Sequence, residues 1–318
     1  MKIIPPRFEL GRDEVRKPVI TIGNFDGLHR GHRELIRKVI ARARKIGGQG
    51  ALITFIPHPI RVLHPDANLE ILTTLEQKIV LLEDQGIDLL ILLEFTPEFS
   101  RMSAEKFVRE YLVGTLGVAE IYAGEDFSFG HGHEGNLRLL LSLAGELQFK
   151  VHVVSKTPSG THPISSSRIR SLVKKGKVSE SAEMLGRLYT IEGRVAKGAG
   201  RGKNLGYPTV NLEEVRNLLP APGIYITETQ VRGKTLPSVS YLGPRLTFGE
   251  SSPAIESHIL DYHEEVYGDW VRLAFISKIR GTMKFRSPEE LKEAIAKDVA
   301  RARRYFERSL PKDGKTGS

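Results

Sequence analysis

The chain has 318 residues, and 47 Lys and Arg against 38 Asp and Glu give it a formal net charge of +9. At roughly 100–200 residues per domain the length suits two domains, and 40% hydrophobic with 27% charged residues is typical of a globular protein, which excludes a disordered chain, a collagen and a coiled coil. Because there is no cysteine, disulfides, thiolate nucleophiles, iron–sulfur clusters and sulfur-ligated zinc are excluded.

The amino-terminal residues 1–14 combine prolines and charges without an apolar run, so we expect no secretory signal. The most apolar stretch, residues 89–93, is too short to cross a bilayer. We therefore expect a cytoplasmic protein without a membrane partner. Much of the positive excess lies in residues 30–45 and 292–308. It indicates either solvated helix faces or attraction of polyanions and phosphorylated small molecules, and charge alone does not separate the two.

The first half of the chain alternates strand and helix patterns. Amphipathic periodicity predicts four helices, at 31–45, 75–85, 104–116 and 137–147. Between them, apolar runs predict five strands, at 19–22, 51–55, 89–95, 121–123 and 151–154. This is the βαβ pattern of an α/β domain, a parallel sheet with helices on both faces, in which ligands bind at the carboxyl ends of the strands.

After residue 186 the pattern changes to short strands separated by Gly and Pro turns, which predicts an antiparallel barrel or sandwich. A last helix is expected to begin at the Ser287–Glu290 capping box and to bury Leu291, Ile295 and Val299. We expect domains at 1–186 and 187–318, with residues 309–318 disordered. The strands are predicted at 189–196, 209–212, 224–231, 237–242, 255–260 and 271–276.

The first chemical motif, residues 23–32, directly follows the first predicted strand and opens a helix. Its glycines allow a sharp turn and close approach to a ligand, and a helix N-terminus favours phosphate. His29 and His32 are three residues apart, so they lie on one face of the first turn and can donate hydrogen bonds to an oxyanion. The histidines of a His-x-x-His pair more often lie on the surface or pack in the core without a function. Here, however, the position of the pair between strand and helix favours a phosphate-binding site. Metal binding would need a third ligand, which is not nearby.

The motif resembles the His-x-Gly-His nucleotidyltransferases, which share their fold with class I aminoacyl-tRNA synthetases. The longer string Gly-Asn-Phe-Asp-Gly-x-His-x-Gly-His is similar to the adenylyltransferase half of the prokaryotic bifunctional riboflavin kinase/FMN adenylyltransferases. Segments 54–59, 124–130 and 164–170 match that family in the expected order, and the resemblance covers about residues 19–306. It implies a Rossmann-like domain in which ATP and flavin are bound by Gly23, Asn24, Phe25, Asp26, Gly31, Asp126, Ser165, Ser166 and Ser167.

The implied reaction is attack of an FMN phosphate oxygen on the α-phosphorus of ATP, with release of pyrophosphate. The nucleophile is already ionised near neutral pH, so the site must position the reactants and stabilise negative charge. His29, His32 and Arg168 suit this task, with Mg²⁺ sharing it. Ser and Arg are common at helix starts, so the Ser-Ser-Ser-Arg run at 165–168 is by itself weak evidence for a phosphate site. Family members usually have Thr at Ser167, and the hydroxyl is retained.

The second motif is the glycine-rich run 198–206, followed by Tyr207-Pro208-Thr209-Val210-Asn211. It is not a Walker A sequence, and a flexible hairpin is the simpler interpretation of the glycines alone. In an extended segment, however, Thr209 and Asn211 project to one face. Their hydroxyl and amide oxygens suit Mg²⁺ carried in with a nucleotide, while backbone N–H groups of the loop cover the phosphates.

This continuation resembles the riboflavin kinase signature, which implies ATP and flavin binding by Gly200, Gly202, Lys203, Gly206 and Pro208. A neutral hydroxyl nucleophile benefits from a base, and the resemblance assigns that role to Glu256, although a lone strand glutamate is more often an exposed surface residue. The family commonly has Pro-Thr-Phe where this chain has Leu246-Thr247-Phe248. His58 and His263 have no assigned role.

The sequence therefore predicts phosphorylation of riboflavin to FMN by the second domain and adenylylation of FMN to FAD by the first. The expected ligands are riboflavin, FMN and ATP with Mg²⁺; zinc, haem and iron–sulfur clusters are not expected, and the flavins are substrate and product rather than redox cofactors. Two alternatives remain: another adenylyltransferase with a non-catalytic β-domain, and a flavin- or RNA-binding regulator. With 7% aromatic residues and no array of them among basic residues, nucleic acid is not an expected partner.

Overall fold

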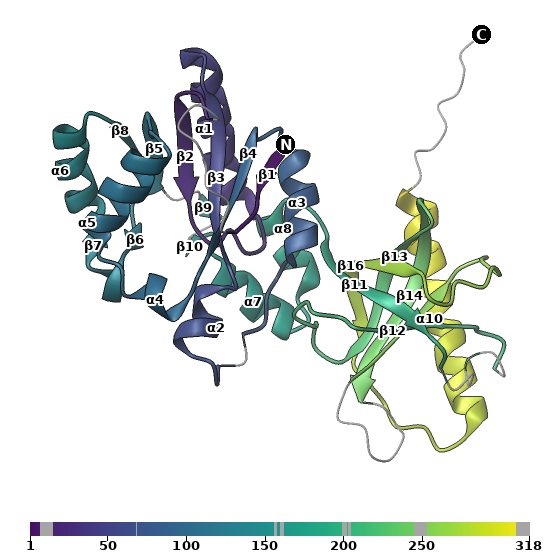
Figure 1. Ribbon diagram of the computed structural model, residues 1–318. Helices are drawn as coiled ribbons and strands as arrows, with labels where there is room; N and C mark the ends of the chain where they lie inside the picture. Colours follow the sequence, from purple (N-terminus) through teal and green to yellow (C-terminus); the bar gives the residue numbers. More distant parts are fainter. Residues whose placement is uncertain are drawn as a thin grey trace, which may run out of the picture. The chain divides into compact units, whose positions relative to one another are not determined.

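A computed structural model of the chain describes residues 1–6, 15–67, 69–155, 158–159, 162–198, 202, 205–244 and 253–309. The chain divides into two compact units, Met1–Ser166 and Ser167–Ser318, and each is considered by itself (Figure 1). Gly200, Lys203, Leu246 and the carboxyl-terminal residues 310–318 lie outside the described residues, so the predictions made for them stay predictions. Among the described residues no helix is long and apolar enough to cross a membrane.

The first unit is built on a six-stranded sheet in the order β1-β4-β3-β2-β5-β8, in which every neighbouring pair is parallel. From β2 the chain moves to β3 and β4 on one side and then returns to β5 on the other, so the strand order switches beside β2. Ligands bind outside the carboxyl ends of strands at such a switch point. The strands are β1 Lys2–Ile4, β2 Pro18–Ile22, β3 Gln49–Ile56, β4 Leu89–Glu94, β5 Glu120–Gly124 and β8 Lys150–Val154.

Helices cover both faces of this sheet, as predicted (Figure 1). Alternate residues of β3 show why: Leu52 packs with α1 (Arg30–Ile46) and α3 (Leu75–Glu83), whereas Ala51 and Ile53 pack on the opposite face. That second face is covered by α6 (Leu137–Leu147) and by α5 (Ala104–Lys106), which continues into the π-helix η2 (Phe107–Thr115). Shorter elements are α2 Pro59–Leu63, α4 Pro97–Ser100, β6 Ser128–Phe129, η3 His131–His133, β7 Gly135–Asn136, β9 Pro158–Ser159 and β10 His162–Pro163.

The second unit is a closed antiparallel barrel in the order β11-β12-β15-β14-β13-β16, which confirms the predicted architecture. Its interior includes five fully buried hydroxyl side chains that hydrogen-bond to one another, so no water is needed to satisfy them: Thr227, Thr229, Ser238, Ser240 and Ser257. The strands are β11 Tyr189–Ala196, β12 Val210–Glu213, β13 Gly223–Val231, β14 Lys234–Pro244, β15 Pro253–Ile259 and β16 Trp270–Arg280.

The terminal helix α10 (Pro288–Ser309) packs outside the barrel, where Val299 and Ala302 join a cluster with barrel residues such as Ile226. Ser287 caps it as predicted, because its hydroxyl accepts the Glu290 N–H at 3.2 Å. Two helices precede the barrel, α7 (Ser166–Lys174) and α8 (Val178–Leu185). The predicted domain limit at residue 186 would place both helices in the first domain. The division into compact units instead falls after Ser166, so almost all of α7 and the whole of α8 belong to the unit that contains the barrel.

Candidate functional sites

The loop of residues 23–29 joins the carboxyl end of β2 to α1 and has an unusual backbone. Phe25 and Leu28 have positive φ angles of 47° and 39°, and Gly27 lies between them at 82°. Such conformations cost free energy in residues other than glycine, and they persist where the surroundings fix them. Phe25 and Leu28 are both buried in the core shared with α1, which holds the loop in this shape.

Asp26, predicted to bind a ligand, fastens the loop to the segment before α3. Its buried carboxylate accepts the backbone N–H groups of Leu72 and Thr73, both at 3.0 Å, and the Thr73 hydroxyl at 3.3 Å. From the other direction, the Ser166 hydroxyl donates to the Asp26 carbonyl at 2.8 Å. The loop is therefore pre-organised before any ligand binds, and direct contact of Asp26 with a ligand stays a prediction.

The two imidazoles lie together, as their spacing predicts. The His29 and His32 rings stack with centroids 3.6 Å apart, and the Phe25 and His32 rings make an edge-to-face contact with centroids 5.0 Å apart. His29 caps α1, because its Nδ1 accepts the His32 N–H at 3.3 Å. Burial, the neighbouring His29 and then Lys78 hold the pKa of His32 well below its ordinary value. His32 is therefore neutral near pH 7, where an imidazole can donate a hydrogen bond without carrying a charge.

Lys78 belongs to this site although the sequence did not single it out. It lies in the first turns of α3, and its Nζ donates to the Asn24 carbonyl at 2.7 Å and to the Thr54 hydroxyl at 3.3 Å. Burial lowers the pKa of Lys78 to about 8, against the opposing effect of Asp26. One signal could have identified it. A cation near a helix N-terminus opposes the macrodipole, which suggests a purpose other than helix stability.

For the other predicted residues of the adenylyl-transfer site, the structure gives their place in the backbone but no contact with the imidazoles. Gly23 donates its N–H to the Ile53 carbonyl at 3.0 Å, and Gly31 lies in the first turn of α1. Ser165 directly precedes α7, and Ser167 and Arg168 lie in its first turn. Ser167 and Arg168 belong to the second unit, whereas the imidazoles belong to the first, and each unit is considered by itself. The roles of Ser165, Ser167 and Arg168 in binding therefore stay predictions.

Aromatic side chains gather beyond the carboxyl ends of β3 and β4. Phe55, Phe95 and Phe99 meet at centroid distances of 5.6–6.2 Å. Phe127 and Phe129, from the predicted loop 124–130, stack at 5.2 Å, and Phe129 reaches the same core through Phe107. The exposed Asp126 lies in the turn that Phe127 closes by donating to the Gly124 carbonyl. This arrangement provides an apolar surface at the carboxyl ends of the strands.

In the barrel, the structure brings together the three residues predicted to carry phosphoryl transfer. Asn211 on β12 pairs directly with Glu256 on β15, and the Thr209 hydroxyl lies 3.5 Å from Glu256 Oε2. Thr209 and Asn211 therefore point to the same face, as the alternation along a strand predicts. Just before them, the Pro208 carbonyl lies 2.8 Å from His258 Nδ1, which ties the motif to β15.

Two glycines of the second motif approach this cluster closely. A Cβ atom added to Gly198 would lie 2.1 Å from Asn211 Nδ2, and one added to Gly202 would lie 2.4 Å from the Tyr207 carbonyl oxygen. Gly202 also accepts the Tyr207 N–H at 2.8 Å, while Gly206 has a φ of 89°. The glycines are therefore required for packing against the motif, beyond any flexibility they add.

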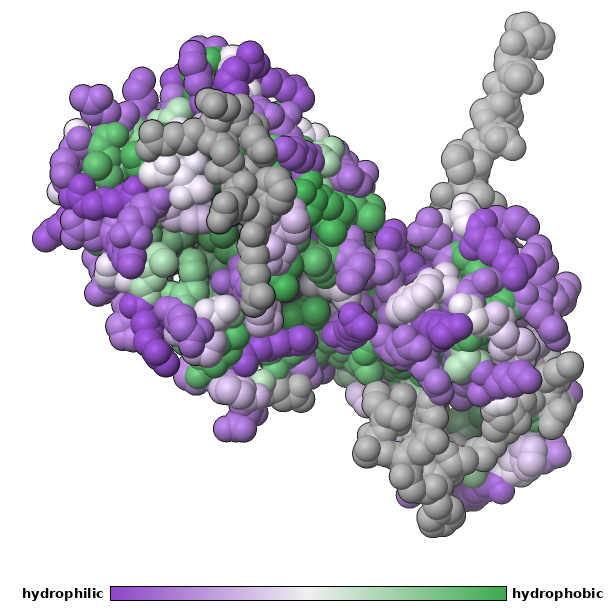
Figure 2. All heavy atoms as spheres, viewed as in Figure 1, coloured by the Kyte–Doolittle hydropathy of each residue, from purple (hydrophilic) through white to green (hydrophobic). Residues whose placement is uncertain are grey.

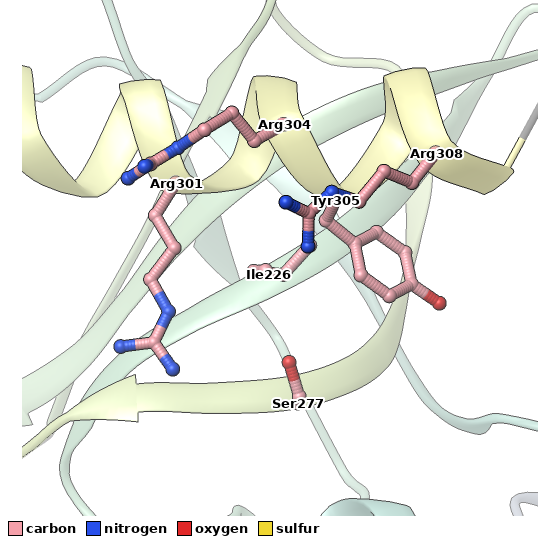
Figure 3. Close-up of a pocket in the computed structure, with 6 residues that line it drawn as sticks. All are labelled: Ile226, Ser277, Arg301, Arg304, Tyr305 and Arg308. Carbon is pink, nitrogen blue, oxygen red and sulfur yellow. The ribbon is translucent and has the colours of Figure 1, made fainter.

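Some basic residues of α10 form ion pairs, and others line a cavity. Arg303 pairs with Asp261 at 2.7 Å. Arg301, Arg304 and Arg308 lie along one side of the same helix and line a cavity of about 640 Å³, together with Tyr305, Ile226 and Ser277 (Figure 3). None of these six was predicted as a site residue. Figure 2 shows hydrophilic residues over most of the visible surface of both units, so many of the charges are solvated.

Comparison with known proteins gives two adjacent family matches. Residues 12–168 match the family model described as FAD synthetase, and residues 185–306 match the model described as riboflavin kinase. A bifunctional riboflavin kinase/FMN adenylyltransferase of Escherichia coli K12 is 33% identical over 312 residues, covering 98% of this chain and 100% of that protein. The corresponding protein of Listeria monocytogenes is 34% identical over 291 residues, covering 91% and 92%.

Among solved structures, a Streptococcus pneumoniae protein described as a macrolide-efflux protein aligns with a TM-score of 0.85 and 28% identity, over 94% of this chain and 98% of that one. The overall fold is therefore shared along nearly the whole chain. The riboflavin kinase match over the barrel does not support the two alternatives, a non-catalytic β-domain and a binding regulator.

Proposed function

The chain belongs to the family of bifunctional riboflavin kinase/FMN adenylyltransferases, with the adenylyltransferase in its N-terminal and the kinase in its C-terminal domain, and we propose which residues perform each reaction. In this proposal the loop 23–29 and the start of α1 hold the ATP that adenylylates FMN. The face of the barrel that carries Thr209, Asn211 and Glu256 holds the ATP that phosphorylates riboflavin. The functional domains are proposed at 1–186 and 187–318.

Adenylyl transfer forms a bond between an FMN phosphate oxygen and the α-phosphorus of ATP and breaks the α–β phosphoanhydride bond. The neutral imidazoles suit this step. Because His29 Nδ1 accepts the His32 N–H, neutral His29 carries its proton on Nε2, where it can donate to a phosphate oxygen. The α1 N-terminus lies at the same place and favours negative charge. Donors fixed in advance stabilise the transition state without reorganising.

Arg168 and the serines Ser165 and Ser167 complete this proposal as further phosphate-binding groups. A guanidinium matches the oxygens of a phosphate in pairs, and serine hydroxyls at a helix start add donors beside the helix N–H groups. The Ser166 hydroxyl, which donates to the Asp26 carbonyl, supports this role because it ties the serine run to the loop that carries the imidazoles.

We propose that the isoalloxazine ring of FMN binds against the aromatic side chains beyond β3 and β4. Planar aromatic ligands gain free energy by burial and by stacked or edge contacts with such residues. Phe55 and Phe99 are half-buried, so part of each ring surface remains available to a ligand. Phe127 and Phe129 from the 124–130 loop extend the same apolar surface.

Phosphorylation of riboflavin needs a different arrangement, because the nucleophile is a neutral hydroxyl. Glu256 lies beside Thr209 and opposite Asn211, so a carboxylate base and two polar side chains face the same space. The oxygen atoms of this set are the hard ligands that Mg²⁺ prefers, and no group of three or more His, Asp or Glu among the described residues offers a rival metal site. Thr209 and Asn211 would hold the ion, which when bound neutralises charge on the phosphates.

The observation that carries the proposal is the convergence of Thr209, just before β12, with Asn211 on β12 and Glu256 on β15 in one unit, and of the two imidazoles in the other. The test incubates the full chain with riboflavin, ATP and Mg²⁺ and separates the flavins over time. FMN should accumulate first and FAD second, and FMN supplied with ATP should give FAD and pyrophosphate. A chain that forms neither product would refute the assignment.

A further inference from the structure

Lys78 places an ammonium group between the carboxyl ends of two central strands. Its Nζ donates to the Asn24 carbonyl, in the loop after β2, at 2.7 Å and to the Thr54 hydroxyl, near the end of β3, at 3.3 Å. These two bonds link the carboxyl ends of β2 and β3, and β2 is one of the two strands between which the strand order switches. They use two of the three ammonium N–H groups and fix the direction of the third.

The charge of Lys78 has no carboxylate partner among the described residues. Asp26 is the acidic residue that acts on it, but that carboxylate accepts the backbone N–H groups of Leu72 and Thr73. A buried cation without a counter-ion is costly to the fold. The buried ammonium therefore destabilises the free protein, and an anionic ligand bound beside it would offset this effect.

Within the described part of the chain, the enclosed atoms Asn24 Oδ1 and His32 Nδ1 also have no hydrogen-bond partner. Each unsatisfied buried group destabilises the protein, so such groups are uncommon unless a ligand or water completes them. His32 Nδ1, when it carries the ring proton, can donate to an anion, whereas Asn24 Oδ1 can only accept and is satisfied by a donor from a ligand or water.

We propose that Lys78 binds the polyphosphate of ATP in the adenylyl-transfer site, with its third N–H donating to a phosphate oxygen while Asn24 and Thr54 hold the ammonium in place. This inference rests on the proposed function of the loop 23–29. The neutral imidazoles then supply hydrogen bonds, and Lys78 supplies the positive charge that they lack.

The assignment has a consequence for pH dependence. The groups that act on Lys78 and its surroundings are Asp26, His29 and His32, and burial leaves the pKa of Lys78 at about 8 in the free protein. Above that pH the free enzyme loses the charge, so kcat/KM for ATP in FAD formation should fall. Bound polyphosphate favours the protonated form, so kcat should persist to higher pH.

The test uses the full chain and compares Lys78→Met, Lys78→Arg and, as a matched control, the exposed Lys106→Met. FAD formation from FMN and ATP is measured from about pH 6.5 to pH 10, and riboflavin phosphorylation is measured in the same preparations. Lys78→Met should lower kcat/KM for ATP about 10- to 100-fold, as for loss of one charged hydrogen bond, and remove the fall above pH 8. Lys78→Arg should restore binding and move the fall to higher pH, while the kinase is unchanged in all variants.

Labelling of the wild-type chain covers the case in which Lys78→Met does not fold. Acetylation of Lys78 at pH 8, followed by mass spectrometry, should slow when ATP or inorganic pyrophosphate is present, whereas that of Lys106 should not. An unchanged kcat/KM for ATP in a folded Lys78→Met, a pH fall retained in that variant, or labelling unaffected by either anion would overturn the inference. A wild-type chain that forms no FAD would instead refute the proposed function itself.

Discussion

The imidazole rings of His29 and His32 stack with centroids 3.6 Å apart and planes within 14° of each other. Burial penalises a charged His32, and the neighbouring His29 and then Lys78 add to this effect, so the pKa of His32 lies well below 6.5. The structural effect is that His32 stays neutral in the folded chain while the unfolded chain protonates it near its ordinary pKa. Stability therefore depends on pH through this residue.

We expect the first unit to lose stability as the pH falls below 6.5, because the unfolded chain then binds a proton that the folded chain does not. The loss can reach about 1.4 kcal/mol per pH unit. Urea unfolding followed by circular dichroism at several pH values measures it. His32→Asn should flatten this dependence, whereas replacing the exposed His64 by Asn should leave it in place. An identical slope in His32→Asn would contradict the explanation.

The two reactions should be separable by single substitutions. His32→Asn should lower FAD formation from supplied FMN about 100-fold or more while riboflavin phosphorylation continues, since it replaces the imidazole by a shorter amide in the first site alone. Glu256→Gln should lower riboflavin phosphorylation by about 100- to 10,000-fold, the usual effect of losing a general base, and leave FAD formation from FMN intact. Chromatography of the flavins from each variant checks both outcomes. A folded variant that lost both reactions would show that the division of labour is wrong.

Both architectures could be predicted from the sequence because they are encoded in local patterns. Buried strands such as 89–93 are continuous apolar runs, and α1 repeats its apolar residues with helical spacing. The strand β1 was missed because its three residues are too short to show a pattern. The predicted helix 104–116 is mostly the π-helix η2. The sequence could not specify this, because side-chain periodicity does not reveal to which carbonyl each backbone N–H donates.

The candidate sites were predictable where their residues are neighbours in sequence. Alternation alone places Thr209 and Asn211 on one face, and helical spacing places His29 beside His32. Contacts between distant segments were not accessible in this way. Lys78 meets Asn24 only because α3 folds back over the end of the sheet, and Asp26 finds its partners at residues 72–73 for the same reason.

Asp26→Ala tests whether that carboxylate supports the loop. Removing it leaves the buried N–H groups of Leu72 and Thr73 without an acceptor, so we expect a loss of about 2–3 kcal/mol and of FAD formation. Trp270, the single tryptophan, lies in β16 and reports the barrel alone. Unfolding followed by circular dichroism should shift, while unfolding followed by fluorescence should not.

Two variants sharpen the Asp26 experiment. Asp26→Asn keeps one acceptor oxygen and should lose less stability than Asp26→Ala, while replacing the exposed Asp84 by Ala should change neither transition. If Asp26→Ala unfolded like the wild type by circular dichroism and formed FAD at the normal rate, the carboxylate would not be what holds residues 23–29 in place.

Gly198→Ala tests the kinase site without touching its polar side chains. The new Cβ would lie 2.1 Å from Asn211 Nδ2, and the flexible amide can yield more easily than the barrel backbone. We therefore expect a folded protein in which Asn211 is displaced from Glu256 and riboflavin phosphorylation falls about 5- to 100-fold, as for strain of 1–3 kcal/mol. Gly281→Ala is the matched control, because a Cβ there meets no atom within 4 Å. FMN formation by Gly198→Ala at the wild-type rate would mean that the position of the Asn211 amide does not matter for phosphoryl transfer, and the assignment of Asn211 as a magnesium ligand would fail with it.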